Sequence, residues 1–202
     1  MGRNNRLEKE DFVRTFVFIV VLFCLPTFGK SFDLYFLSLT WPISFCNVRI
    51  ESCKRPVPQD FTIHGLWPGF WNGKTHENCQ SPIVFDKKLV ASLRRDLEGY
   101  WPDLLKPKYE KTDSHFEFWD KQRVKHGSCS AMQPKMYFDA AIRLRKASNL
   151  LKVLRSSGIV PGTKLYTPEE IKIAIENGWG VTPLVKCNKD KRDLQLLEIV
   201  IW

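Results

Sequence analysis

Hydrophobic and polar positions follow two different periods along this chain. Segments rich in β-branched and aromatic residues are predicted to be strands, and they cover residues 32–41, 60–67, 181–187 and 194–201. Apolar residues at helical spacing predict amphipathic helices over residues 86–101, 114–127, 134–158 and 167–178. Strands at both ends with helices between them indicate an α+β domain.

Two of these predicted helices carry recognisable terminal signals. Thr167 and Glu170 have the spacing of a capping box, and Gly178 is expected to end that helix. Ser114 is expected to cap the helix that Gly127 ends.

The first 31 residues differ in pattern from the rest of the chain. Residues 15–29 form an uninterrupted apolar run, and small residues at positions 27, 29 and 31 offer cleavage sites. We expect residues 1–31 to be a signal peptide cleaved near Ser31, and residues 32–202 to form one secreted domain. A signal anchor is the alternative, but the run is short for a membrane span, which needs about 20 residues.

Composition and charge narrow the class of protein. A content of 44% hydrophobic and 26% charged residues argues against a disordered chain. Removing residues 1–31 takes away five basic and three acidic residues and leaves a net charge of +7. This charge favours polyanions such as RNA, acidic wall polysaccharide or an anionic membrane, although a solvated basic surface gives the same composition.

Five cysteines remain after the predicted leader, which contains Cys24, is removed: Cys46, Cys53, Cys79, Cys129 and Cys187. An oxidising compartment favours pairing, but five cysteines cannot all pair within one chain. A zinc site that combines cysteines with His64 and His126 is an alternative, but the chain lacks the short paired spacing of zinc ligands.

Two short segments carry candidate catalytic chemistry. His64 lies in "FTIHGLWP", and the second segment is "FWDKQRVKHGSC", residues 118–129. On a helix, Gln122, Lys125 and His126 face one side because they are three and four positions apart. Two histidines, a lysine and an amide suit RNA cleavage by its own 2′-hydroxyl, which needs a base, an acid and stabilisation of the charge on phosphorus. This chemistry requires no metal.

The same two segments resemble the active-site segments of the T2 family of ribonucleases, and the similarity extends from Phe32 to Ile201. "FDLYFLSLTWPISFC" resembles the first strand and cysteine-bearing turn of the family, and "EIVI" its late strand. The resemblance implies an antiparallel sheet flanked by helices and stabilised by disulfides. It also implies a secreted endoribonuclease that cleaves single-stranded RNA through a 2′,3′-cyclic phosphate, without a metal or cofactor.

The resemblance implies a role for each matching residue. His126 is expected to be the general base, His64 the general acid, and Lys125 a stabiliser of the transition state. Family members commonly have His-Glu where this chain has Lys121 and Gln122. Gln122 is still expected to donate a hydrogen bond to a phosphate oxygen, and Lys121 to supply positive charge. A catalytically weak or dead member that keeps the fold is the alternative.

Several aromatic residues near these segments are candidates for stacking on RNA bases, and packing in the core is the alternative for each. They are Trp67, Phe70, Trp71 and Trp119. The other two histidines, His76 and His115, have no comparable context and are expected at the surface.

Within the family, the chain most resembles the self-incompatibility ribonucleases of flowering plants, through its basic charge, Lys121-Gln122 and its first strand. This implies a stylar protein with pollen-side recognition proteins as partners. A monomer without stable membrane association after signal cleavage is expected. A general extracellular ribonuclease for nutrition or defence would have the same active site.

The family pairing implies two disulfides, Cys46–Cys53 and Cys79–Cys129. It also implies that Cys187 pairs with a cysteine beyond the late strand, at a point where this chain has Trp202. We therefore expect an incomplete or altered C-terminal end, and a Cys187 that is free or paired between chains.

Overall fold

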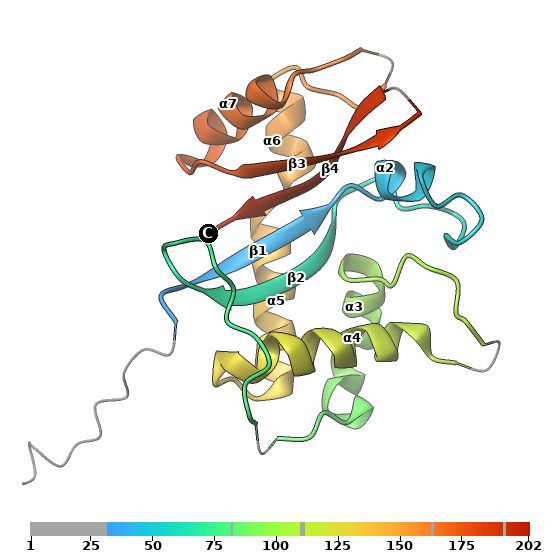
Figure 1. Ribbon diagram of the computed structural model, residues 1–202, viewed down its shortest axis with the longest axis vertical. Helices are drawn as coiled ribbons and strands as arrows, with labels where there is room; N and C mark the ends of the chain where they lie inside the picture. The colour runs from blue at the N-terminus through green and yellow to red at the C-terminus, as the bar shows by residue number, and fades with distance from the viewer. Residues whose placement is uncertain (1–31, 82, 110–111, 163, 192) are drawn as a thin grey trace, which may run out of the picture. The chain divides into compact units, whose positions relative to one another are not determined.

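The computed structural model describes residues 32–81, 83–109, 112–162, 164–191 and 193–202, and these contain a four-stranded antiparallel sheet (Figure 1). The strands are β1 (Leu34–Thr40), β2 (Thr62–Gly69), β3 (Leu184–Asp190) and β4 (Asp193–Ile201). Their order in the sheet is β2-β1-β4-β3, so the first and last strands of the sequence lie side by side in the middle. The predicted α+β class and antiparallel sheet are confirmed. The predicted leader lies outside the described residues.

The helices lie between β1 and β3 in the sequence. They are α2 (Pro42–Asn47), α3 (Arg94–Tyr100), α4 (Ser114–Lys125), α5 (Pro134–Ser148), α6 (Leu150–Ser156) and α7 (Pro168–Trp179), with 3₁₀ turns η1 (Lys87–Leu93) and η2 (Gly127–Ser130). Short α2 was not predicted, and the predicted helix over residues 86–101 begins as η1. Among the described residues, none of the helices is long and apolar enough to cross a membrane.

The predicted helix over residues 134–158 is two helices. Asn149 has φ of 27°, which places it in the left-handed region and separates α5 from α6. Asparagine tolerates positive φ better than most residues, so the break falls at a suitable side chain. The apolar spacing continues across Asn149, which is why periodicity alone did not reveal the break.

Of the predicted helix ends, the capping box at Thr167 is right, Gly178 and Ser114 are wrong, and Gly127 lies two residues past Lys125, the last residue of α4. Thr167 and Glu170 form the capping box of α7. That helix continues past Gly178 and ends at Gly180, whose φ of 70° suits a residue without a side chain. The cap of α4 is Asp113, not Ser114, because the Asp113 carboxylate accepts a hydrogen bond from the Phe116 amide at 3.1 Å.

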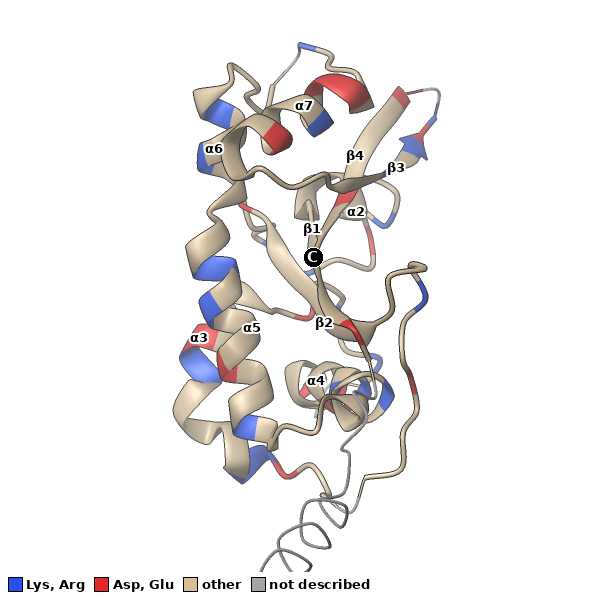
Figure 2. Ribbon diagram, turned by 90° about the vertical axis from the view of Figure 1, so that its left-hand side faces the viewer, with Lys and Arg blue, Asp and Glu red and all other residues tan. Residues whose placement is uncertain are grey.

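The main core lies between one face of the sheet and α5, which crosses β1 and β2 (Figures 1 and 2). The sheet contributes fully buried Leu39, Ile63 and Ile199, and α5 contributes Tyr137 and Phe138. Hydrophobic burial on this face leaves the opposite face of the central strands available for polar residues.

A bulge in β2 changes which residues face the core. Ile63 pairs with Leu39 and Gly65 pairs with Ser38, so His64 is the extra residue of β2. A bulge redirects side chains locally. Ile63 is buried on the core side, while His64 remains partly exposed.

Both disulfides implied by the family resemblance are present, Cys46–Cys53 and Cys79–Cys129. The first closes the turn that follows α2. The second joins the segment after β2 to the turn after α4, although the two cysteines are 50 residues apart. Cys187 of β3 is half-buried, and it is unpaired within the described part of the chain.

Candidate active site

His64 lies on the bulge of β2, on the face of the sheet away from α5. Its Nδ1 atom is 2.5 Å from Oε1 of Glu198, and its side chain is 43% exposed. The backbone carbonyl of His64 accepts a hydrogen bond from Trp101 Nε1 at 3.0 Å, which anchors the bulge to the core. The contact with Glu198 leaves Nε2 as the ring nitrogen available to a substrate.

His126 is the residue that ends α4, and its amide donates to the Gln122 carbonyl at 3.0 Å. Its ring is buried, and Nδ1 has no hydrogen-bond partner within the described part of the chain. Burial lowers the pKa of His126 to about 4, with the Glu77 carboxylate acting in the opposite direction. His126 is therefore neutral at mildly acidic and neutral pH, as a proton acceptor must be.

Trp67 contacts both histidine rings. Its ring centroid is 5.1 Å from that of His64 and 5.2 Å from that of His126. Its Nε1 donates to Oε1 of Gln122 at 3.3 Å, which leaves the Gln122 amide nitrogen free to donate elsewhere. Gly65 makes this packing possible, because a Cβ at that position would lie 1.9 Å from Trp67 Nε1.

The predicted helical group is present on the last turn of α4. Lys125 Nζ lies 3.4 Å from Oε2 of Glu77, and the other oxygen of Glu77 is 3.9 Å from His126 Nδ1. Thr75 holds that second oxygen with a hydrogen bond of 2.5 Å. Sequence reasoning missed Glu77, which lies in a loop with no spacing signal.

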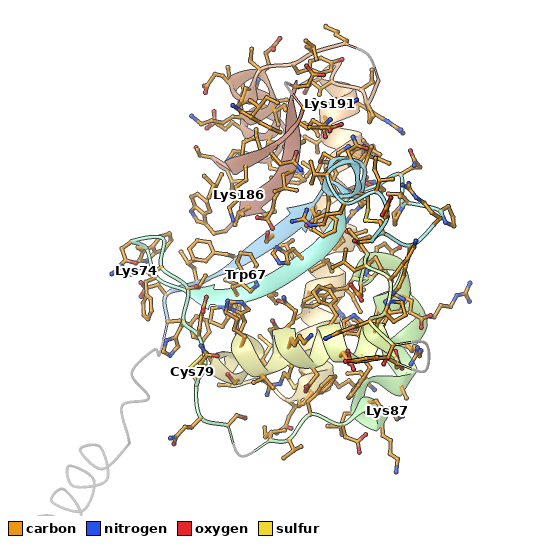
Figure 3. The ribbon with its side chains drawn as sticks, turned by 45° about the vertical axis from the view of Figure 1, so that its right-hand side comes forward. Trp67, Lys74, Cys79, Lys87, Lys186 and Lys191 are labelled. Carbon is orange, nitrogen blue, oxygen red and sulfur yellow. A yellow bond between two sulfur atoms is a disulfide. The ribbon has the colours of Figure 1, made fainter. Side chains whose placement is uncertain are left out.

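The Cys79–Cys129 disulfide keeps the Glu77 loop against the end of α4, where Cys79 lies in Figure 3. Next to it, the Asn78 amide donates to the Lys125 carbonyl at 2.7 Å. Each of these two links joins the loop to α4 or to the turn that follows it. Together they hold the Glu77 carboxylate beside His126.

Glu198 is the second residue that sequence reasoning missed. It is buried on β4 and is contacted by His64 on β2, Lys186 on β3 at 2.8 Å, and the hydroxyl of Ser38 on β1. Burial alone would raise the pKa of Glu198, but the hydrogen bond and charge of His64, with the hydrogen bonds of Lys186 and Ser38, outweigh it and lower that pKa to about 2. Glu198 is therefore a carboxylate at all working pH values.

The structure places other predicted residues away from this group. The prediction for Trp119 is wrong: it is 1% exposed and donates to the Trp101 carbonyl, so it packs in the core. Phe70 packs against His76 in the turn after β2, and Trp71 is exposed beside it. Lys121 is exposed on α4, one turn before Lys125.

The two remaining histidines are not simple surface residues. His76 is half-buried, with Nε2 3.1 Å from the sulfur of Cys79. His115 is half-buried at the other end of α4 and accepts a hydrogen bond from the Asp103 amide at 3.0 Å. His76, Cys79 and Cys129 cluster closely enough to suggest metal ligands, but the two sulfurs are joined in a disulfide and are not thiolates.

Comparison with known proteins supports the family. The model of the ribonuclease T2 family matches residues 32–202. Intracellular ribonuclease LX of Solanum lycopersicum is 36% identical over 182 residues, covering 86% of this chain and 75% of that protein. Ribonuclease S-2 of Nicotiana alata is 37% identical over 178 residues, covering 87% of this chain and 80% of that protein.

Solved structures show the same fold. The crystal structure of RNase NT in complex with 5′-AMP has a TM-score of 0.74 and 38% identity, and covers 84% of each chain. The self-incompatibility-associated SF11-RNase of Nicotiana alata has a TM-score of 0.69 and 34% identity, covering 84% of this chain and 85% of that one. The chain therefore belongs to the ribonuclease T2 family and is a ribonuclease of this type.

Proposed function

We propose that this enzyme cleaves single-stranded RNA by transesterification without a metal. Neutral His126 takes the proton of the 2′-hydroxyl, and the 2′-oxygen forms a bond to phosphorus. The bond from phosphorus to the 5′-oxygen breaks, and His64 gives that oxygen a proton. The products are a 2′,3′-cyclic phosphate and a free 5′-hydroxyl.

The observation that carries this proposal is the unequal surroundings of the two histidines. The ring of His126 is buried and favours its neutral form, whereas His64 has the Glu198 carboxylate at Nδ1, which stabilises the imidazolium. Both histidine rings contact the ring of Trp67. A buried histidine and an exposed histidine held by a carboxylate, both beside one tryptophan, suit a base and an acid.

The charge that builds on the phosphoryl oxygens needs donors. Lys125 is half-exposed beside His126 and supplies a positive charge, and the free amide nitrogen of Gln122 supplies a hydrogen bond. Exposed Lys121 extends the positive surface along α4. Trp67 is partly exposed and offers a ring for an RNA base, with Phe70 in the adjoining turn.

The test compares His64→Ala and His126→Ala with a matched histidine control. His115→Gln is suitable because glutamine can still accept from the Asp103 amide, far from the site on α4. Each site variant is expected to lose about 10² to 10⁴-fold in RNA cleavage, while the control keeps its rate. Circular dichroism reports whether each variant folds.

Two further measurements separate this enzyme from the alternatives. Cleavage should continue in EDTA and should give cyclic phosphate ends, and loss of activity on chelation would contradict the metal-free mechanism. Wild-type protein that folds and binds RNA but does not cleave it would instead support a catalytically dead member of the family.

We infer secretion from the predicted leader, cleaved near Ser31, and from the two disulfides, which persist in oxidising compartments. Relatives in Solanum lycopersicum include both an extracellular ribonuclease LE and an intracellular ribonuclease LX. The N-terminal sequence of protein recovered from culture medium tests the inference, and retention of residues 1–31 in a membrane fraction would support the signal anchor.

A role in self-incompatibility is the second proposal. Its support is the similarity to ribonuclease S-2 and to the SF11-RNase of Nicotiana alata. Pollen-side recognition proteins would then be partners of a monomeric enzyme. Accumulation of the transcript in the style supports this role, and accumulation in other tissues supports a general extracellular ribonuclease.

A further inference from the structure

A row of polar side chains crosses the sheet on the face away from α5, with one residue from each strand. In spatial order they are His64 on β2, Ser38 on β1, Glu198 on β4 and Lys186 on β3. Lys186 is the direct cross-strand partner of Glu198, and the bulge at His64 puts its ring at the other end of the row. Glu198 is the only member that contacts the other three.

Glu198 is the buried charged member of this row. Its side chain is only 7% exposed, and it directly precedes Ile199, which pairs with buried Leu39. A buried carboxylate is costly unless hydrogen bonds and opposite charges compensate it. Here one oxygen meets both His64 Nδ1 and the Ser38 hydroxyl, and the other meets Lys186 at 2.8 Å.

The geometry fixes how the His64 ring is oriented. With Nδ1 held 2.5 Å from Glu198, the other ring nitrogen, Nε2, points away from Glu198. Trp67 packs edge to face against the ring, and Lys186 Nζ lies 5.6 Å from the centroid of Trp67 on the same side. Figure 3 labels Trp67 on β2 and Lys186 on β3, the two outer strands of the sheet.

We propose that Glu198 is a positioning residue for the general acid: it accepts a hydrogen bond from Nδ1 of His64 and so directs Nε2 toward the leaving group, and Lys186 moderates the charge of Glu198. The proposal rests on the function proposed above for His64. In the chemical step the Nε2 proton moves to the departing 5′-oxygen, and the electron pair stays on Nε2. The Nδ1 proton remains in its hydrogen bond to Glu198.

The other charged groups near His64 lie on the far side of the Trp67 ring. His126 lies across Trp67, with Glu77 and Lys125 beside it. Ser38 is the contribution of β1 and does not change charge. Substitutions at positions 198 and 186 therefore alter the surroundings of His64 while leaving the group around the base in place.

The first experiment uses two variants of the full chain with opposite charge effects. Glu198→Gln removes the negative charge that lies beside His64, so the alkaline limb of the kcat/KM profile should move to lower pH. Lys186→Met leaves Glu198 without its cation, so the same limb should move to higher pH. Lys189→Met is the matched control, because Lys189 is an exposed lysine on the same strand opposite Leu194, and it should leave the limb in place.

The second experiment separates acid catalysis from general damage. In uridylyl-adenosine the leaving group is the 5′-oxygen of adenosine, which needs a proton donor. In uridine 3′-(4-nitrophenyl phosphate) the leaving group is 4-nitrophenolate, which departs without one. Glu198→Gln should lose roughly 10 to 100-fold in activity on the dinucleotide, the range typical when the hydrogen-bond partner of a metal-binding histidine is changed. It should lose much less on the nitrophenyl ester.

The outcomes distinguish the two proposals. Equal losses of Glu198→Gln on both substrates, or alkaline limbs that do not move in opposite directions, would overturn the role of Glu198. Equal losses of His64→Ala on both substrates would instead overturn the assignment of His64 as the acid. If Glu198→Gln does not fold, Lys186→Met decides the matter, because Lys186 is 40% exposed and its predicted shift has a fixed sign.

Discussion

Acidification should destabilise this enzyme through His126 before it protonates the carboxylate of Glu198. Burial lowers the pKa of His126 from 6.5 to about 4, so the folded state resists a proton that the unfolded chain accepts. The stability that comes from neutral His126 is fully present above pH 6.5. It is lost as the pH falls toward about 4.

The size of this effect follows from the two pKa values. Between pH 7.5 and 4.5, the unfolded chain takes up nearly one proton at this position and the folded chain a fraction of one. The linkage relation then gives a loss of about 2.5 kcal/mol in the free energy of unfolding, a large share of the roughly 5–15 kcal/mol of a typical domain.

The pH window separates this effect from the effect of Glu198. The pKa of Glu198 is lowered from 4.5 to about 2, so its contribution is intact above pH 4.5 and is lost only below that value. His115 also has a pKa lowered by burial and by Lys54, so it acts in the same direction as His126. A comparison of variants is therefore needed.

Urea unfolding at pH 7.5 and 4.5 measures the effect for wild type and His126→Gln. The wild type should lose about 2.5 kcal/mol more between these two pH values than the variant, whatever their absolute stabilities. Equal losses would refute the reasoning that burial keeps His126 neutral. The same pKa predicts that the acid limb of the kcat/KM profile lies near pH 4, because a protonated base is inactive.

Four other predictions test single features. Gln122→Glu places a carboxylate beside His126 and should move the acid limb of the pH–rate profile to higher pH; an unchanged profile would mean that position 122 takes no part in the chemistry. Glu77→Gln removes a carboxylate 3.9 Å from His126 and should move that limb to lower pH, and an opposite shift would contradict the contact. Cys187 should be alkylated without prior reduction, slowly because burial raises the pKa of its thiol; mass spectrometry that finds it in an intramolecular disulfide would contradict the pairing. Thr167→Ala should lower the free energy of unfolding by about 1 kcal/mol in urea titrations, and no change would mean that the capping box contributes nothing.

Local features of this protein could be predicted because they depend on neighbours in the sequence. Gln122, Lys125 and His126 share the end of one helix, and helical geometry alone brings them to one side. The capping box at Thr167 satisfies backbone groups three residues away. The strands near both ends were predicted from their composition, since β-branched and aromatic side chains suit a half-buried sheet.

Resemblance supplied what local physics could not. The two disulfides join cysteines that composition alone could pair in several ways, and the family pairing proved correct. The substitution at positions 121 and 122 was visible only against the family pattern. Trp119 shows the limit of this reasoning, because this tryptophan of the catalytic segment is buried in the core, where it donates to the Trp101 carbonyl.

Only the tertiary structure decided which groups complete the site. Glu198 meets His64 because β4 and β2 lie on either side of β1, and a bulge turns His64 toward it. Glu77 meets His126 because a disulfide holds a loop against α4. These contacts join residues 134 and 49 positions apart, so they depend on strand register and loop closure rather than on any spacing along the chain. Burial of His126 is likewise a property of the packed fold, and it is burial that keeps this histidine neutral.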